Sequence, residues 1–287
     1  MSQRIDTFTH AGFEFLVRDT GPIDGVPVVL LHGFPQRGSS WDKVAAHLHA
    51  AGFRTFAPDQ RGYSPGARPK GRKPYRVPEL VADVAALIER IGEPVHLVGH
   101  DWGAIVAWSV AAEHPDSIRT LTAVSVAHPG AFLKSMTSST QLFHSWYMAL
   151  FNITGAMELI SRRAPRQLAV ALRRSGMDAE MVRTFQREIV EDGALPGGLA
   201  WYRALPLTDL RASAGKVAVP TTMVWSTDDV ALVRKGAELT ERFVTGDYRL
   251  EILHGVSHWI PDQAPDVLAE AILDRTGPAR PDPAAGA

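Results

Sequence analysis

Short apolar runs rich in β-branched residues alternate with longer stretches of helical period over most of this chain. The apolar runs lie at 28–31, 54–57, 95–98 and 121–124, and the helical stretches at 77–91 and 105–113. Apolar runs without polar alternation are typical of strands buried on both faces, with helices covering those faces. The pattern therefore predicts an α/β fold whose central sheet is mostly parallel and flanked by helices.

This alternation stops at Ala131 and resumes only near residue 212. Between these points lie several short amphipathic stretches separated by Gly and Pro, without a strand-like run. Strand character returns at 221–225 and 248–253, and a last helical stretch covers 265–275. A chain of 287 residues fits one large domain with an insertion. The predicted parts are a first core segment (1–130), a helical lid (131–211), a second core segment (212–276) and a disordered tail (277–287).

Composition and charge exclude several classes of function. Thirty basic and 31 acidic residues leave a net charge of −1, which favours a small neutral substrate over nucleic acid or an anionic membrane. The absence of cysteine excludes disulfides, thiolate nucleophiles and sulfur-ligated metals. His47 and His49, two apart on a helical stretch, point in different directions, so we predict neither a metal nor a cofactor. Without a signal-like start or an apolar run of about 18 residues, we expect a cytoplasmic protein.

One junction between a predicted strand and a predicted helix has a glycine on each side of a central acid. Residues 99–103 are Gly-His-Asp-Trp-Gly. Where a strand turns abruptly into a helix, neighbouring backbone comes so close that side chains at both glycine positions would collide. The central residue is then strained and projects at the carboxyl end of the sheet, over the helix N-terminus. We therefore predict that Asp101 is a nucleophile rather than a simple helix cap.

Three further motifs accompany this turn along the chain. They are His-Gly-Phe-Pro at 32–35, Asp-Gln-Arg-Gly-Tyr at 59–63 and Gly-Val-Ser-His-Trp at 255–259. With these motifs the chain resembles the α/β-hydrolase superfamily, and within it the branch of epoxide hydrolases and haloalkane dehalogenases, whose nucleophile is an aspartate. The resemblance implies an α/β-hydrolase fold with an inserted helical lid. It also implies hydrolysis of an epoxide to a diol through a covalent ester on Asp101.

The same resemblance selects the other two members of a catalytic triad, which follow the nucleophile in the order acid, histidine. Asp228 and Asp229 are adjacent just past a late strand. Family members resemble Trp-Gly-x-x-Asp-x-x-Leu at this point, which selects Asp229 and leaves Asp228 as the alternative. His258, in a glycine-containing loop after the last strand, is the predicted base, and His254 is the second choice.

Backbone and lid groups complete the predicted site. The loop at 32–35 follows the first buried strand, where this fold presents an N–H group to an oxyanion, so we expect the main chains of Phe34 and Trp102 to form the oxyanion hole. Tyr147 and Tyr202 resemble the two lid tyrosines that epoxide hydrolases direct at the ring oxygen. We expect substrate contacts from Phe34, Trp102, Trp146 and Trp201.

The identity of the nucleophile and of the leaving group defines the chemistry. An ionised aspartate, with an ordinary pKa of about 4, attacks a saturated carbon without a base to activate it. Water activated by His258 would then attack the ester, with Asp229 orienting the imidazole. An epoxide oxygen leaves as an alkoxide and needs a proton, which a phenol can supply, whereas a halide needs only weak N–H donors. The alternatives are a haloalkane dehalogenase, with Trp102 and either Trp146 or Trp201 as halide donors, and a non-catalytic ligand receptor on this fold.

Overall fold

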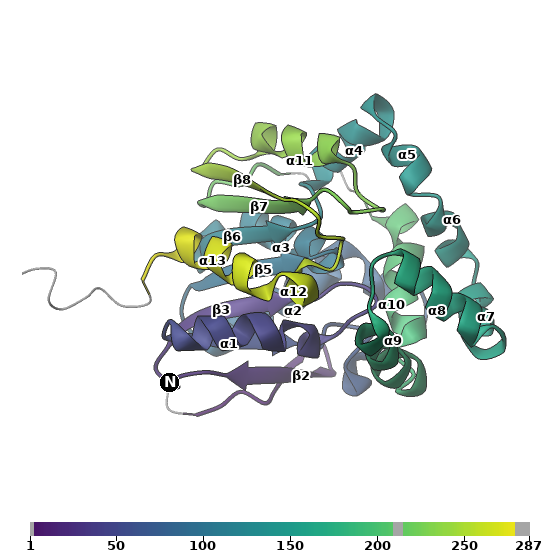
Figure 1. The fold of residues 1–287 in the computed structure, drawn as a ribbon. Helices are drawn as coiled ribbons and strands as arrows, with labels where there is room; N and C mark the ends of the chain where they lie inside the picture. Colours follow the sequence, from purple (N-terminus) through teal and green to yellow (C-terminus); the bar gives the residue numbers. More distant parts are fainter. Residues whose placement is uncertain (1–2, 209–214, 279–287) are drawn as a thin grey trace, which may run out of the picture.

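Eight strands form one sheet at the centre of the computed structural model, which describes residues 3–208 and 215–278 (Figure 1). The strand order is β1-β2-β4-β3-β5-β6-β7-β8. β1 with β2 and β2 with β4 are antiparallel, and every other neighbouring pair is parallel. The strands are β1 (Thr7–His10), β2 (Phe13–Thr20), β3 (Val26–Leu31), β4 (Phe53–Pro58), β5 (Val95–His100), β6 (Ile118–Val124), β7 (Thr221–Ser226) and β8 (Tyr248–Leu253).

Helices cover both faces of this sheet. The core helices are α1 (Asp42–Ala50), α2 (Val77–Ile91), α3 (Trp102–Glu113), α11 (Arg234–Thr240), α12 (Ile260–Gln263) and α13 (Pro265–Thr276). Along β3, Val28 and Leu30 pack with α1 and α13, whereas Val29 and Leu31 pack with α2 and α3 in a second cluster. Side chains of a strand alternate between faces, so a run buried on both sides has to be apolar at every position. The predicted mostly parallel α/β sheet is confirmed.

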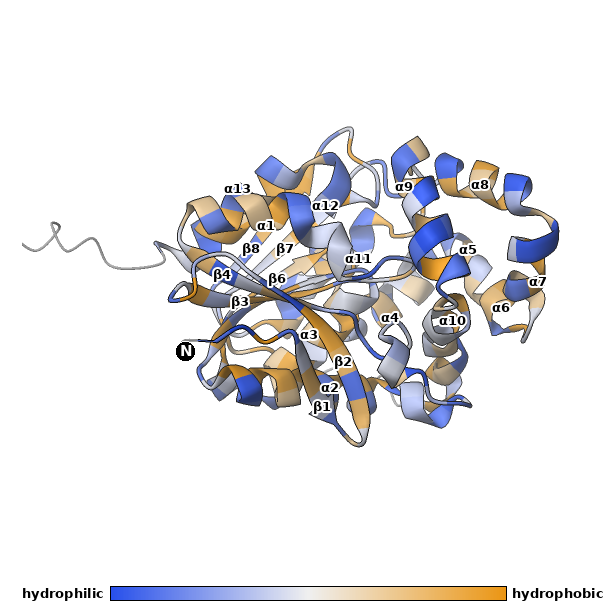
Figure 2. Cartoon of the chain, turned by 90° about the horizontal axis from the view of Figure 1, so that it is seen from below, coloured by the Kyte–Doolittle hydropathy of each residue, from blue (hydrophilic) through white to orange (hydrophobic). Residues whose placement is uncertain are grey.

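Helices α1, α2 and α13 carry polar residues on their outer sides, whereas α3 is buried along most of its length. In Figure 2, α1 and α13 show both hydrophobic and hydrophilic residues, as expected of helices with one buried face. Helix α2 covers the predicted range 77–91. Pro78 lies in its first turn, and Gly92, at φ 84°, ends it with an N–H bond to the Ile88 carbonyl. Among the described residues, no helix is long and apolar enough to cross a membrane.

Helices α4 to α10 follow β6 and precede β7, and they gather beyond one end of the sheet (Figure 1). The first begins at Pro129, two residues before the predicted boundary at Ala131, and the predicted end near residue 211 lies outside the described residues, as does most of the predicted tail. Their bounds are α4 (Pro129–Ser138), α5 (Gln141–His144), α6 (Tyr147–Asn152), α7 (Ala156–Arg163), α8 (Pro165–Arg174), α9 (Ala179–Phe185) and α10 (Leu195–Ala204). We call this segment the lid.

The antiparallel pair β1 and β2 was not predicted. β2 buries alternate residues, among them an aspartate, so it lacks the continuous apolar run of the other strands. That aspartate, Asp19, is buried because it accepts a 2.7 Å hydrogen bond from the Arg54 guanidinium and another from the Ile5 N–H. A buried charge that is paired and hydrogen-bonded can occupy a core-facing position. An alternation pattern that counts only apolar residues therefore misses this strand.

Candidate active site

The turn between β5 and α3 holds Asp101 in a strained backbone conformation, with φ 52° and ψ −120°. A Cβ added at Gly99 would lie 2.3 Å from the Gly103 carbonyl oxygen, and one added at Gly103 would lie 2.1 Å from the Leu31 carbonyl oxygen. Both approaches are too short for any side chain, so both positions require glycine. The close packing of β3, β5 and α3 thus forces the Asp101 side chain out at the carboxyl end of the strands.

Main-chain groups surround the Asp101 carboxylate. The Phe34 N–H donates to Oδ1 over 2.7 Å, and the Trp102 backbone also hydrogen-bonds to this carboxyl. A Cβ at Gly33 would lie 2.3 Å from Oδ1, so the loop at 32–35 needs glycine to reach the carboxylate. Burial alone would raise the pKa of the Asp101 carboxyl, but the hydrogen bond and charge of His258 overcome this and hold the pKa below its ordinary value. Asp101 is therefore ionised at neutral pH.

His258 lies between two carboxylates. Its Nδ1 is 2.7 Å from Asp229 Oδ2, and its Nε2 is 3.6 Å from Asp101 Oδ2. The remaining oxygen of Asp229 accepts N–H bonds from Ala231 and Leu232 at 2.8 and 3.0 Å, so both oxygens of this buried carboxylate have fixed partners. The fold thus places the His258 imidazole between the carboxylates of Asp101 and Asp229.

The two alternatives for the acid and the base lie elsewhere. Asp228 is exposed and accepts a hydrogen bond from its neighbour Thr227, as a turn residue does. His254 is also exposed, at the start of the loop that carries His258. The geometry therefore places Asp229 and His258, and neither Asp228 nor His254, beside Asp101.

The two carboxylates set the charge of the imidazole. Burial would lower the pKa of His258, but the Asp229 charge and the hydrogen bonds to Asp101 and Asp229 raise it to about 10. The imidazole is consequently protonated while Asp101 is ionised. Because Asp101 supplies part of this stabilisation, loss of its charge would lower the pKa of His258 again.

A cavity of about 80 Å³ opens on Asp101 beneath the lid. Both predicted lid tyrosines line it, with their ring centroids 6.3 Å apart. Burial, and then the Asp101 charge, raise the pKa of the Tyr147 and Tyr202 phenols, so both stay protonated and able to donate. The remaining lining is apolar and consists of Trp102, Ile105, Val126, Ala127, Pro129, Phe132, Met148, Leu205 and Leu232.

Two tryptophans predicted to contact substrate do not line this cavity. The Trp146 side chain lies on the surface, 68% exposed, although its neighbour Tyr147 faces the cavity. Trp201 is buried behind the cavity wall, where its indole N–H donates to the Arg61 carbonyl over 2.8 Å and its ring packs edge-on against Trp102. Its N–H is therefore occupied in joining the lid to the core. Phe34 packs against Tyr202, next to the cavity lining.

How the loop at 32–35 is held in place was not predicted from the sequence. The Gln60 side chain donates to the His32 carbonyl over 2.6 Å, and the Gln60 backbone N–H donates to Nε2 of the same histidine. Burial lowers the pKa of His32 to about 3, so this imidazole stays neutral and can accept that bond. The motif at 59–63 contained the signal, because its residues follow the neighbouring strand β4 and meet the loop after β3.

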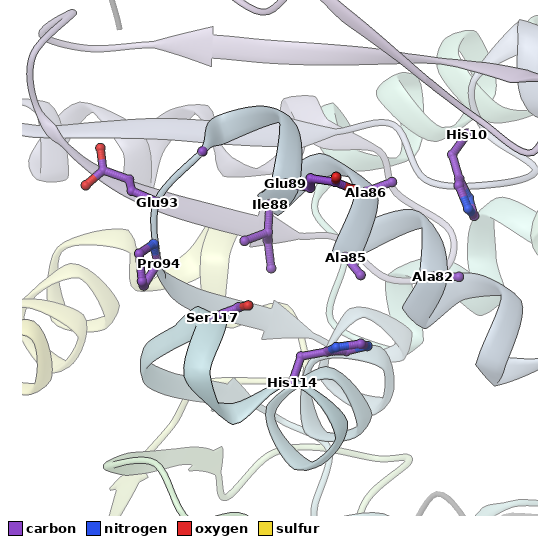
Figure 3. A pocket seen from close by; sticks show the side chains of 11 residues that line it. His10, Ala82, Ala85, Ala86, Ile88, Glu89, Glu93, Pro94, His114 and Ser117 are labelled. Atoms are coloured by element: carbon purple, nitrogen blue, oxygen red, sulfur yellow. The ribbon is translucent and has the colours of Figure 1, made fainter.

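A larger hollow, of about 700 Å³, lies near the amino end of the central strand β5 (Figure 3). It lies between α2 and the segment after α3, and its lining includes His10, Glu89 and His114 together with several alanines. Pro94, which also lines it, precedes β5, whereas Asp101 follows that strand. Ligands of open α/β sheets bind at the carboxyl ends of the strands, so the smaller cavity at Asp101 is the candidate active site.

Comparison with known proteins identifies the family to which this chain belongs. Residues 26–265 match the family described as the alpha/beta hydrolase fold. The fold, the strained turn and the acid–imidazole pair all agree with this match. The chain belongs to the α/β-hydrolase fold family.

Individual relatives show to which branch of this fold family the chain is similar. The chain is 33% identical over 271 residues to an α/β-hydrolase superfamily protein of Bacillus subtilis, covering 92% of this chain and 94% of the relative. It is 31% identical over 263 residues to epoxide hydrolase 2 of Caenorhabditis elegans, covering 87% and 73% respectively. A solved epoxide hydrolase from Vigna radiata is similar with a TM-score of 0.78 at 26% identity, over 93% of this chain and 96% of that one. The chain is an enzyme of the hydrolase class and groups with the epoxide hydrolase branch.

Proposed function

We propose that this enzyme hydrolyses epoxides to vicinal diols through a covalent ester on Asp101. The observation that carries the proposal is one apolar cavity that holds an ionised carboxylate and two protonated phenols. This set matches the needs of ring opening, in which one carbon is attacked while the oxygen takes up a proton. The named epoxide hydrolases among the relatives support it.

In the first half-reaction Asp101 Oδ2 attacks a ring carbon. Its partner Oδ1 accepts the Phe34 N–H, and the Trp102 backbone also bonds to this carboxyl, so Oδ1 becomes the carbonyl oxygen of the ester. The C–O bond of the ring breaks, and the departing oxygen takes a proton from the Tyr147 or Tyr202 phenol. Transfer of one proton to the developing alkoxide lowers the barrier, since an alkoxide is a poor leaving group in an apolar cavity.

The second half-reaction hydrolyses this ester. Esterification removes the Asp101 charge that helps to raise the pKa of His258, so the imidazolium gives up its proton, which restores the phenol consumed in the first half-reaction, and the imidazole becomes a base. Nε2 then takes a proton from water, the hydroxide adds to the ester carbonyl, and the Phe34 and Trp102 N–H groups stabilise the oxyanion. The carbonyl carbon separates from Oδ2, which leaves with the product and recovers a proton from the imidazolium. The carboxylic acid formed at Asp101 then gives its proton to the imidazole, which restores the ionised carboxylate and the imidazolium.

The substrate class follows from the rest of the lining. Among the residues that the structure describes, no lysine or arginine lines the cavity, and the lining side chains other than Asp101 and the two tyrosines are apolar. A carboxylate or phosphate on the substrate would lose its water without a compensating charge, at a cost of several kcal/mol. We therefore propose an uncharged epoxide with apolar substituents.

The haloalkane dehalogenase alternative is less well supported by this geometry. It needs a second N–H donor beside Trp102, yet Trp146 is at the surface and the Trp201 N–H is bonded to Arg61. The polar side chains that line the cavity with Trp102 and Asp101, among the described residues, are two phenols.

A substrate panel tests the proposal. We expect terminal, internal or aryl epoxides to yield diol, and matched chloro- and bromoalkanes to yield no halide. The Asp101→Ala variant should lose diol formation down to the uncatalysed background, because it removes the nucleophile. Halide release without diol formation would overturn the epoxide assignment, and ligand binding without turnover of either class would indicate a receptor.

A further inference from the structure

The backbone carbonyl of His258 accepts three hydrogen bonds. Nε2 of His100 lies 2.9 Å away, the Ser125 hydroxyl lies 3.1 Å away, and the Ile260 N–H lies 3.0 Å away. The Ile260 bond is local to the turn that starts α12. The other two come from the ends of β5 and β6, remote in sequence, so they tie the loop of the base to the centre of the sheet.

Nε2 of His100 can act only as a hydrogen-bond donor toward the His258 carbonyl. A carbonyl oxygen accepts, so the proton of the His100 imidazole is on Nε2. Its Nδ1 then carries no proton, and this nitrogen is buried without a hydrogen-bond partner among the described residues. Burial lowers the pKa of His100 to about 4, so the ring stays neutral and its donor state is constant at neutral pH. A fully buried histidine with one idle nitrogen, placed directly before the nucleophile, is not explained by the catalytic steps above.

Ser125 holds an unusual backbone conformation. Its φ is 67°, in the left-handed region that few residues other than glycine occupy. Its N–H bonds to the Val224 carbonyl over 2.8 Å, and this conformation directs the hydroxyl at the His258 carbonyl. Strain of this kind persists where the surroundings determine it and is concentrated at functional sites.

The bonds to the carbonyl hold the main chain of the base itself. The neighbouring carbonyls of Val256 and Ser257 are held separately, by the Asp228 N–H over 3.1 Å and the Ser226 hydroxyl over 2.8 Å. The loop is less buried at its start. It follows β8, the outermost strand of the sheet, whose side chains are only half buried at alternate positions. The first two loop residues, His254 and Gly255, are exposed. The imidazole is fixed by Asp229 at Nδ1, and its main chain by the three bonds to the carbonyl. Two anchors at opposite ends of one residue determine where Nε2 points.

We propose that His100 and Ser125 are positioning residues. They hold Nε2 of His258 where it can take a proton from the water that hydrolyses the Asp101 ester. The inference rests on the proposed function. Attack on the epoxide needs no base, so these two residues serve the second half-reaction and leave the first unaffected. A displaced base costs rate steeply, since a misplacement of about 1 Å can cost about 100-fold.

The test separates the two half-reactions in single turnovers with enzyme in excess, using styrene oxide as the probe and mass spectrometry of quenched samples. In Ser125→Ala and His100→Leu we expect adduct formation within about twofold of the parent rate and hydrolysis slowed about 10- to 100-fold. His100→Gln keeps an N–H donor and should recover most of the hydrolysis rate. Ser109→Ala removes another buried hydroxyl, bonded to Ile105 on α3, and should change neither rate.

A glycine variant separates positioning from stability. Ser125→Gly relieves the left-handed strain while removing the hydroxyl, so it should be at least as stable as Ser125→Ala and equally slow in hydrolysis. Recovery of hydrolysis in Ser125→Gly would show that strain and not the hydrogen bond mattered, and would overturn the proposal. Equal slowing of both half-reactions, or unchanged hydrolysis in Ser125→Ala, would overturn it as well.

A readout without substrate keeps this inference distinct from the proposed function. In NMR titrations of the His258 imidazole, Ser125→Ala should shift its pKa and weaken the Nδ1 proton signal that arises from the bond to Asp229. An unchanged titration and proton signal would contradict the positioning role. If the parent enzyme opened no epoxide, the proposed function would fail, and this titration would still decide the role of His100 and Ser125.

Discussion

Replacing His258 by alanine should produce an enzyme that is alkylated once and then stalls. Alkylation of Asp101 needs only its carboxylate, which main-chain N–H groups hold in place, whereas hydrolysis of the ester needs a base. We expect steady-state turnover to fall about 10³- to 10⁴-fold, at the upper end of general-base effects. Intact-protein mass spectrometry should show one substrate-sized adduct, and peptide mapping should place it on Asp101.

Two comparisons sharpen this experiment. The Asp101→Ala variant should form no adduct, because nothing remains to attack the ring. The His254→Ala variant should behave like the parent, since that histidine is exposed and remote from the carboxylates. Consumption of epoxide by the His258→Ala variant without any adduct would contradict the assigned base and point to direct attack by water.

The double variant Tyr147→Phe, Tyr202→Phe should lose epoxide opening while keeping its fold. Both phenols line the cavity at Asp101, so phenylalanine preserves the packing and removes only the proton donors. Loss of a general acid costs about 10²- to 10⁴-fold, and the loss should lie in the alkylation rate rather than in hydrolysis of the ester. Each single variant should retain partial activity, because the other phenol can still donate.

A matched control is available at the start of the edge strand β8. Tyr248→Phe removes a phenol from β8, outside the cavity, and should leave turnover unchanged. Unchanged alkylation in the double variant would contradict the assignment of an alkoxide leaving group. It would favour a leaving group that departs without a proton.

The elements that the sequence predicts well are those whose determinants are local. Helix α2 matches its predicted range because its apolar period, Pro78 and Gly92 all lie within one segment. The turn at Asp101 was predicted equally well. Close backbone contacts require glycine at positions 99 and 103, and this spacing of two glycines is visible in the sequence. Strand β2 was not, because the ion pair that permits Asp19 to be buried depends on Arg54 in another strand.

The lid shows the limit of a resemblance based on residue type. Trp146 and Tyr147 are adjacent, yet one is at the surface and the other in the cavity, because successive residues of a helix point about 100° apart. Which of them faces inward depends on how α6 packs against α10, a contact that no local pattern encodes. The same holds for the donors to the His258 carbonyl, which come together only when β5, β6 and the loop after β8 are assembled.

The origin of the oxygen in the diol tests the central claim most directly. If Asp101 attacks the ring and water then attacks the ester carbonyl, the first diol carries an oxygen from the carboxylate, and the solvent oxygen stays on the enzyme. A single turnover in heavy-oxygen water, with enzyme in excess, should therefore yield mostly unlabelled diol and a labelled Asp101, and later turnovers should deliver label to the product. A first diol that already carries the full solvent label would show that water opens the ring directly, and would contradict the covalent mechanism.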